Sequence, residues 1–123
     1  MAELATNIGI VPMTVKTTNV AVTRGKRVTL DSSGTVAVSA IGVRGDYVTT
    51  NDIAASDYGS ATPMQAGSKV DAYASETVAV GDAAYSAASG QFSKTSTNAV
   101  LVGKWAQAAA ANTLGVVLIE TVA

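Results

Sequence analysis

The chain has 123 residues, of which 48% are hydrophobic and 14% are charged, and its net charge at pH 7 is −1. This length fits one domain with its own core, and so small a charge gives no overall field to attract nucleic acid or an anionic membrane. The chain has neither cysteine nor histidine, which excludes disulfides, thiolate nucleophiles, thiolate metal sites and histidine proton transfer. We therefore expect a non-enzymatic protein without catalytic residues, cofactor or metal.

The first 18 residues predict an extended N-terminal arm rather than part of the core. They are rich in threonine, and Pro12 opposes an early helix. Extended arms often find partners, so Pro12, Val15 and Lys16 are candidate contacts with another protein. Residues 19–123 are expected to form a single β domain. No stretch approaches the ~20 apolar residues of a membrane helix, and the expectation is a protein made in the cytoplasm.

From Val20 onward, short alternating apolar runs are separated by glycine, serine and aspartate. Short strands with frequent turns are typical of an all-β fold. Residues 31–34, DSSG, predict a turn in which Gly34 takes the left-handed conformation. The fold class expected is therefore all-β, as a compact β-barrel or sandwich.

Residues 49–68 carry glycine, proline, asparagine and serine without clear periodicity, which predicts a long loop. The β pattern resumes at residues 69–74 and continues at 99–105 and 114–122. Residues 116–119, VVLI, are a continuous apolar run that predicts a central strand covered on both faces. Trp105, Phe92 and most of the tyrosines are expected in the core, since they are the few large side chains.

The sequence contains an imperfect internal repeat. GKRVTLDSSGTV at residues 25–36 and GDAAYSAASGQF at 81–92 share the pairs Gly25/Gly81, Ser33/Ser89 and Gly34/Gly90, each 56 positions apart. Val22 and Val78 match at the same spacing. The spacing predicts two related hairpin units, around residues 22–48 and 78–120.

Several motifs could carry a function. Arg24, Lys26 and Arg27 form the chain's basic cluster, and they predict either a solvated turn or a contact with an acidic protein surface. No aromatic residues interleave with these charges, which argues against nucleic acid. Tyr58 is a candidate anchor if it is exposed. The RGD triplet at residues 44–46 is too short to argue for cell adhesion. Asp52 and Asp57 lack calcium-loop spacing, and Ser93 with Lys94 lacks a pocket.

Residues 77–120 resemble the capsid cement or decoration proteins of tailed bacteriophages. The shared phrase is Gly-Asp-x-x-Tyr, a turn ending in glycine, a strand, Val-Gly, an alanine-rich loop and a terminal apolar strand. The residues that fill it here are Gly81, Asp82, Tyr85, Gly90, Val102, Gly103, Ala108 to Ala111 and Val116 to Ile119. The long loop at 49–68 and the RGD segment depart from the family pattern.

The resemblance implies a structural virion protein on the outer surface of an expanded icosahedral capsid. Its expected partners are the major capsid protein and further copies of itself, with a homotrimer favoured, and it would stabilise the shell by bridging capsid subunits. It implies no catalytic residue. The alternative is a capsid-surface or tail module in which the long loop or the RGD turn recognises a host glycan or receptor.

Overall fold

The computed structural model describes residues 12–120 and is all-β, as the sequence predicts. A single short 3-10 turn, Ala88–Gly90, accompanies ten strands in this part of the chain. The strands are β1 (Met13–Lys16), β2 (Arg27–Leu30), β3 (Val36–Val38), β4 (Tyr47–Thr49), β5 (Tyr58–Pro63), β6 (Lys69–Tyr73), β7 (Ala83–Ser86), β8 (Phe92–Ser93), β9 (Leu101–Gln107) and β10 (Leu114–Ile119). No helix in these residues is long and apolar enough to cross a membrane.

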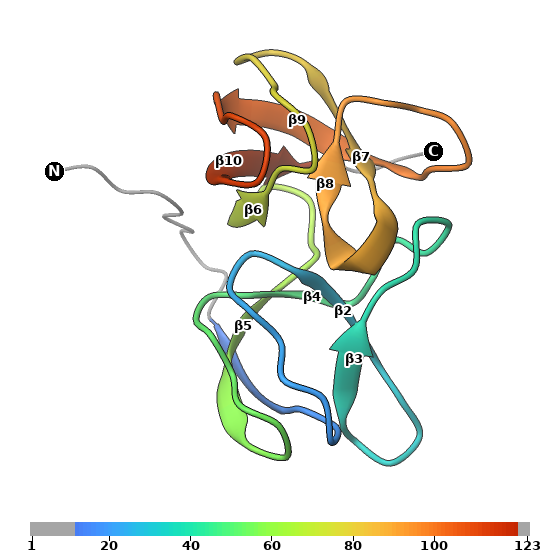
Figure 1. The fold of residues 1–123 in the computed structure, drawn as a ribbon, viewed down its shortest axis with the longest axis vertical. Coiled ribbons are helices and arrows are strands. Elements are labelled where there is room, and N and C mark those ends of the chain that lie inside the picture. Colours follow the sequence, from blue (N-terminus) through green and yellow to red (C-terminus); the bar gives the residue numbers. More distant parts are fainter. Residues whose placement is uncertain (1–11, 121–123) are drawn as a thin grey trace, which may run out of the picture.

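The strands form two five-stranded sheets, one from each half of the chain (Figure 1). The first has the order β1-β5-β4-β2-β3 and the second has the order β6-β10-β9-β7-β8, with antiparallel neighbours throughout. In each sheet the end strands meet again at one parallel bridge, Thr17 with Val36 in the first and Ala74 with Phe92 in the second. Each half is therefore a small, nearly closed barrel, which we call the first unit and the second unit.

The second unit repeats the first strand by strand. Strands β7 and β10 begin and end 56 residues after β2 and β5. An isolated bridge between Val22 and Ile53 recurs at the same spacing as the bridge between Val78 and Ala109. The sequence predicts this repetition at residues 25–36 and 81–92, and the structure extends it over the whole described chain.

The first strand of each unit departs from this spacing by one residue. Val15 of β1 pairs with Gly59, whereas Ala72 of β6 pairs with Gly115. Since Gly59 and Gly115 are 56 positions apart and Val15 and Ala72 are 57 apart, the loop after β1 is one residue longer than the loop after β6. The equivalent residues of β1 and β6 are therefore 57 positions apart, and Val15 and Ala72 both face a core.

The turn at residues 31–34 forms as predicted, with Gly34 at a φ of +81°. One oxygen of Asp31 accepts from the Ser33 amide at 2.8 Å, and the other accepts from the Thr35 hydroxyl at 2.6 Å. The Thr35 hydroxyl and backbone hydrogen bonds lower the pKa of Asp31, because they stabilise its charged form. The Asp31 side chain thus holds this turn by accepting hydrogen bonds from the residues that follow it.

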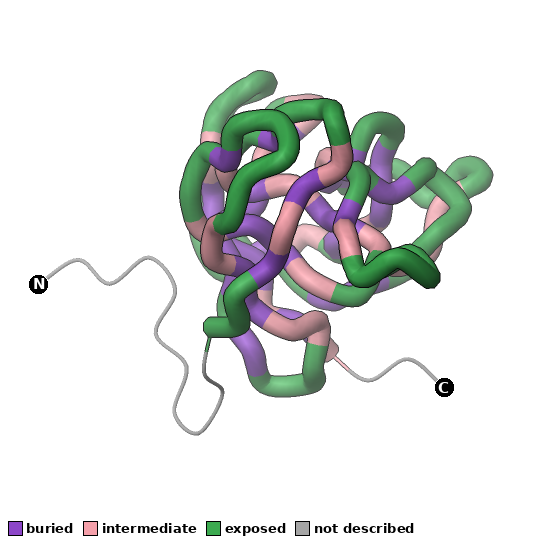
Figure 2. The backbone as a smooth tube through the Cα atoms, turned by 90° about the horizontal axis from the view of Figure 1, so that it is seen from below, coloured by how far each residue is buried: buried purple, intermediate pink, exposed green. Residues whose placement is uncertain are grey.

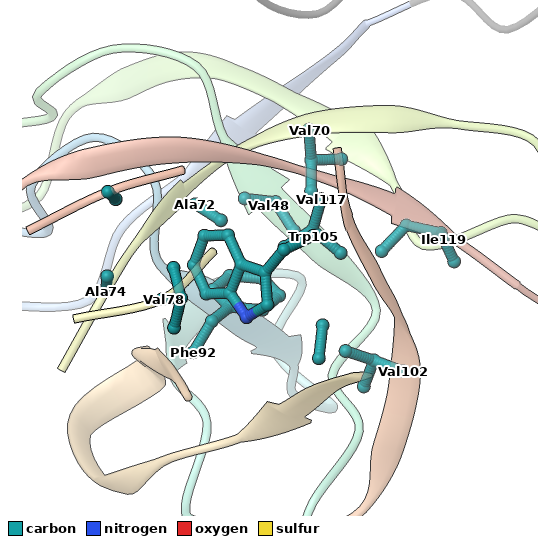
Figure 3. Packing of buried hydrophobic residues seen from close by; sticks show 12 residues of the cluster. Val48, Val70, Ala72, Ala74, Val78, Phe92, Val102, Trp105, Val117 and Ile119 are labelled. Carbon is teal, nitrogen blue, oxygen red and sulfur yellow. The ribbon is translucent and has the colours of Figure 1, made fainter. Parts of the chain in front are cut away.

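Each unit has a core of its own. Val15, Val22, Val28, Val36, Ile53 and Ala61 fill the first. The second core is larger and is built around Trp105, whose ring meets Phe92 edge-on at 6.3 Å between centroids (Figure 3). The indole nitrogen of Trp105 donates to the Ser93 carbonyl at 3.1 Å, so its polar atom is satisfied inside the core. Figure 2 shows buried stretches following one another along the backbone between exposed turns.

Two sequence predictions about the first unit are wrong. The predicted arm of residues 1–18 includes β1, which pairs with β5 from Met13 to Lys16; residues 1–11 lie outside the described residues. The predicted loop of residues 49–68 contains β5 itself. Gly59 and Pro63 within β5 are turn formers in isolation, and they hide a strand whose pairing partners are distant in sequence.

Candidate functional site at the junction of the two units

The two units meet where residues 23–26, which we call the docking loop, lie on the outer face of β6 and β10. The Gly25 carbonyl accepts a hydrogen bond from the Tyr73 amide at 3.0 Å. A side chain at Gly25 would collide with Leu114 Cδ2, and the φ of +82° is itself unfavourable for other residues. Glycine is therefore required here for the close approach of the two units.

Arg27 ties the units together from inside. Its side chain is fully buried and donates to the carbonyls of Ala87 at 2.5 Å and Gln91 at 3.1 Å, and also to that of Val43. The guanidinium carbon lies 5.7 Å from the centroid of the Phe92 ring. Burial lowers the pKa of Arg27 to about 10, so the group stays charged at neutral pH.

Arg24 makes a second link across the junction. Its Nη2 lies 2.6 Å and its Nε 3.0 Å from Oδ2 of Asp71, a side chain that is only 7% exposed. The Asp71 Oδ1 atom has no hydrogen-bond partner among the described residues. The Arg24 amide donates to Asp52 at 2.8 Å, which fixes the docking loop against the first unit.

A groove with a volume of about 490 Å³ opens beside these contacts and is bounded by both units. Lys26 projects over the Tyr73 ring, with its Nζ 4.6 Å from the ring centroid. Burial lowers the pKa of Lys26, because desolvation disfavours the charged form. No carboxylate within the described residues pairs with this ammonium. The groove therefore offers a partly desolvated cation that could accept an acidic side chain from another protein.

A second polar and aromatic surface lies on the outside of β1 and β5. The Lys16 Nζ is 5.4 Å from the centroid of the Tyr58 ring. Tyr58 is 65% exposed. Pro12 and Thr14, which are close to Lys16 in the sequence, are also exposed. An exposed tyrosine with an adjacent cation is suited to protein contact.

The structure separates the seven predicted contact residues into three groups. Lys16, Tyr58 and Pro12 lie on the surface of the first unit, and Arg24 and Lys26 line the junction groove. Val15 and Arg27 are buried, so the prediction that they form surface contacts is wrong. Val15 belongs to the first core because β1 is a barrel strand and not an arm. Arg27 points inward, where carbonyls of both units accept hydrogen bonds from its guanidinium.

The charged groups of the RGD triplet are both used within the chain. Arg44 donates to the carbonyls of Glu120 at 3.0 Å and Leu101 at 3.4 Å. One Asp46 oxygen accepts from the Leu30 amide at 2.8 Å. The triplet thus holds a turn of the first unit against the second, which agrees with the sequence argument against adhesion.

Sequence reasoning missed the second-unit half of the junction. Asp71, Tyr73 and Leu114 form the receiving surface for the docking loop. The alternation of Val70, Asp71 and Ala72 indicates that Asp71 faces away from a core, which is a signal for an outward position. Nothing in the sequence says which segment covers it. Within residues 12–120, no three carboxylates lie together as a metal site would need.

Comparison with solved structures finds the same fold in a bacteriophage protein. The head fiber gp8.5 N base of bacteriophage phi29 superposes with a TM-score of 0.73, covering 90% of this chain and 94% of that one, at 17% sequence identity. No protein-family model matches the chain, and no curated protein matches it in sequence. At this identity the likeness concerns the fold.

Proposed function

We propose that this chain is a structural protein of a bacteriophage virion that attaches to the capsid. The observation that carries the proposal is the fold shared with nearly the whole of the phi29 head fiber base, with both halves of the chain included. The resemblance of residues 77–120 to capsid cement proteins points to the same class from the sequence. The two likenesses are independent, because one rests on motif residues and the other on topology.

We propose that the protein acts by binding to the capsid and not by catalysing a reaction. We propose the outer capsid surface as its location and the major capsid protein as its partner, with several copies acting together. An assembly that touches several capsid subunits gains affinity through effective concentration. If it binds only the mature lattice, it also stabilises that lattice by mass action.

The junction groove is the proposed capsid contact. Lys26 is a cation with an aromatic neighbour and no carboxylate partner among the described residues. An acidic side chain of the capsid protein would complete it through a charge-assisted hydrogen bond, which contributes about 1.5 to 3 kcal/mol. Lys26→Ala should therefore weaken binding to purified shells by at least about tenfold.

The matched control is Lys94→Ala, which removes an exposed lysine away from the groove and should leave shell binding unchanged. Equal binding by Lys26→Ala and the native chain would reject the groove as the contact. It would leave the virion assignment itself to be decided separately.

The virion assignment is tested by the copy number of the chain in purified particles, measured against the major capsid protein by quantitative mass spectrometry. A number set by icosahedral symmetry would support a capsid-bound structural role. A handful of copies would favour the alternative of a recognition module at the tail or at one vertex. Absence from particles would overturn the proposal.

A further inference from the structure

The contact between the two units is head-to-tail. The docking loop of the first unit lies on a receiving face of the second unit, formed by Asp71, Tyr73 and Leu114. Because the units have the same fold, the second unit has a docking loop of its own, and the first unit has a receiving face of its own. Neither takes part in the junction, so residues 12–120 contain one copy of each surface that no other described residue covers.

The unused docking loop is residues 79–82. It repeats a backbone hydrogen bond of its counterpart, since the Gly81 amide donates to the Trp105 carbonyl at 2.8 Å as the Gly25 amide donates to the Thr49 carbonyl at 2.9 Å. Gly81 also repeats the left-handed conformation, with a φ of +93°, but no atom lies within 4 Å of the position a side chain would take. Val80 is 67% exposed. No described residue approaches this loop as the second unit approaches Gly25.

The unused receiving face is given by the strand register of the first unit. Tyr58 occupies the place of Leu114, and the one-residue shift of β1 puts Lys16 in the place of Tyr73 and Thr14 in the place of Asp71. Thr14 and Tyr58 are exposed and Lys16 is partly exposed. These side chains form the outer surface of β1 and β5 described above.

We propose that a second copy of this chain occupies each of these surfaces, so that loop 79–82 of one copy docks on the β1/β5 face of the next. Repeating the internal contact places Asp82 against Lys16, as Lys26 lies against Tyr73 within the chain. It places Gly81 beneath Tyr58, as Gly25 lies beneath Leu114. Val80 then meets Thr14, where the internal junction has the Arg24–Asp71 ion pair. The one charged pair, Asp82 with Lys16, has opposite signs, and the two most exposed large hydrophobic side chains of the described residues, Val80 and Tyr58, become covered.

This contact is expected to be weaker than the internal one. Arg27 anchors the internal junction, as does Val48, whose side chain packs in the core of the second unit. These two residues correspond to Ala83 and Lys104 in the second unit. The contact between copies therefore lacks both the buried guanidinium and the apolar side chain that enters the neighbouring core. It is a head-to-tail contact, so copies close into a ring or continue as a filament. The inference does not depend on the proposed function, since it concerns the purified chain alone.

Charge reversal tests the contact directly. Lys16→Glu and Asp82→Lys should each weaken self-association by at least about tenfold in sedimentation velocity, because each puts like charges together. The double variant restores opposite charges and should recover most of the native association. Lys94→Glu is the matched control, which should associate like the native chain. Circular dichroism would establish that each variant is folded.

Mixing two blocked variants tests the head-to-tail arrangement. Tyr58→Arg blocks the receiving face and Val80→Arg blocks the docking loop, so each variant alone should be a monomer. An equimolar mixture should form dimers and nothing larger, because one intact loop meets one intact face. A native chain that stays monomeric at millimolar concentration would overturn the proposal. Oligomers that survive both charge reversals, or a mixture that stays monomeric, would overturn it as well.

Discussion

Arg27 is the residue on which the junction depends most. Its guanidinium has no carboxylate partner in the described chain, and its charge is held by backbone carbonyls from both units. An apolar side chain of similar length would fill the space but leave these carbonyls buried without donors. Buried polar groups that lose their partner cost more than the net value of the hydrogen bond.

Arg27→Met should therefore lower the free energy of unfolding by about 3 kcal/mol or more. Arg27→Lys should be intermediate, because it keeps the charge but cannot reach several carbonyls at once. The measurement is urea denaturation followed by circular dichroism. Lys94→Met, at an exposed site, is the control; a loss of less than about 1 kcal/mol for Arg27→Met would contradict this role for the guanidinium.

For single residues, the sequence predicts which large apolar side chains form the core better than it predicts where a charged side chain lies. Trp105 and Phe92 could be assigned to a core because few other large side chains exist to build one. Arg27 could not be placed, because its cluster with Arg24 and Lys26 is typical of a solvated turn. Two of its carbonyl partners lie about 60 residues away in sequence, and backbone carbonyls have no sequence signature.

Among the elements, β5 and β10 share a glycine that allows a loop to cross them closely. Gly59 lies against Ile53, and a side chain at Gly59 would collide with it; Gly115 lies in the same way against Ala109. The side chain that faces the glycine differs in size between the units: it is isoleucine in the first and alanine in the second. Strand β5 therefore tolerates the large Ile53 because its own residue has no side chain.

Gly59→Ala should destabilise the protein by about 1 to 3 kcal/mol through overpacking. Ile53→Ala should cost about 2 to 5 kcal/mol through the cavity it leaves. Because the new methyl group occupies part of that cavity, the double variant should cost less than the sum of the two single variants. A double-mutant cycle of chemical denaturation measures this coupling. Simple additivity would show that the two positions do not pack against each other.

Strands were predictable where the apolar pattern was local. Residues 99–105 and 114–122 predict β9 and β10, and residues 69–74 predict β6. Strand β1 was missed because its four residues, MTVK, follow Pro12 and are too few to show a clear alternation, and β5 was missed because glycine, serine, threonine and proline make up most of it. What makes them strands is their pairing with each other, which brings together residues more than 40 positions apart.

For the molecule as a whole, the two barrels share more than a covalent link. Val48 belongs to a strand of the first unit, yet its side chain packs in the core around Trp105 (Figure 3). Arg27 likewise reaches across to the turn after β7. We therefore expect the two units to unfold together rather than one after the other.

Val48→Ala should lower the stability of both units at once, by about 2 kcal/mol. Trp105 fluorescence reports on the second unit, whereas far-ultraviolet circular dichroism reports on both. The two signals should give the same denaturation midpoint before and after the substitution. Val38→Ala, at a more exposed position on β3, should change the midpoint little. Separate midpoints for the two signals would contradict coupled unfolding.

The repeat was visible in the sequence mainly at its turns, through Gly25 with Gly81, Ser33 with Ser89 and Gly34 with Gly90, and at the single pair Val22 and Val78. The side chains of the strands have diverged almost completely, because the two units occupy different surroundings. Strand register, which only the structure gives, aligns the halves over their full length. The two surfaces that the junction leaves uncovered follow from that alignment and could not be predicted without it.

The one-residue difference after β1 and β6 bears on how such a chain could have arisen. A strand keeps its inward and outward faces as long as its pairing register is kept. Val15 and Ala72 pair with the equivalent residues Gly59 and Gly115, and both are buried, so the extra residue lies in the loop and leaves the faces of the two strands unchanged. In a chain that arose by duplication, Asp71 and Tyr73 would descend from the same positions as Thr14 and Lys16, and the two outer surfaces would have diverged by substitution alone.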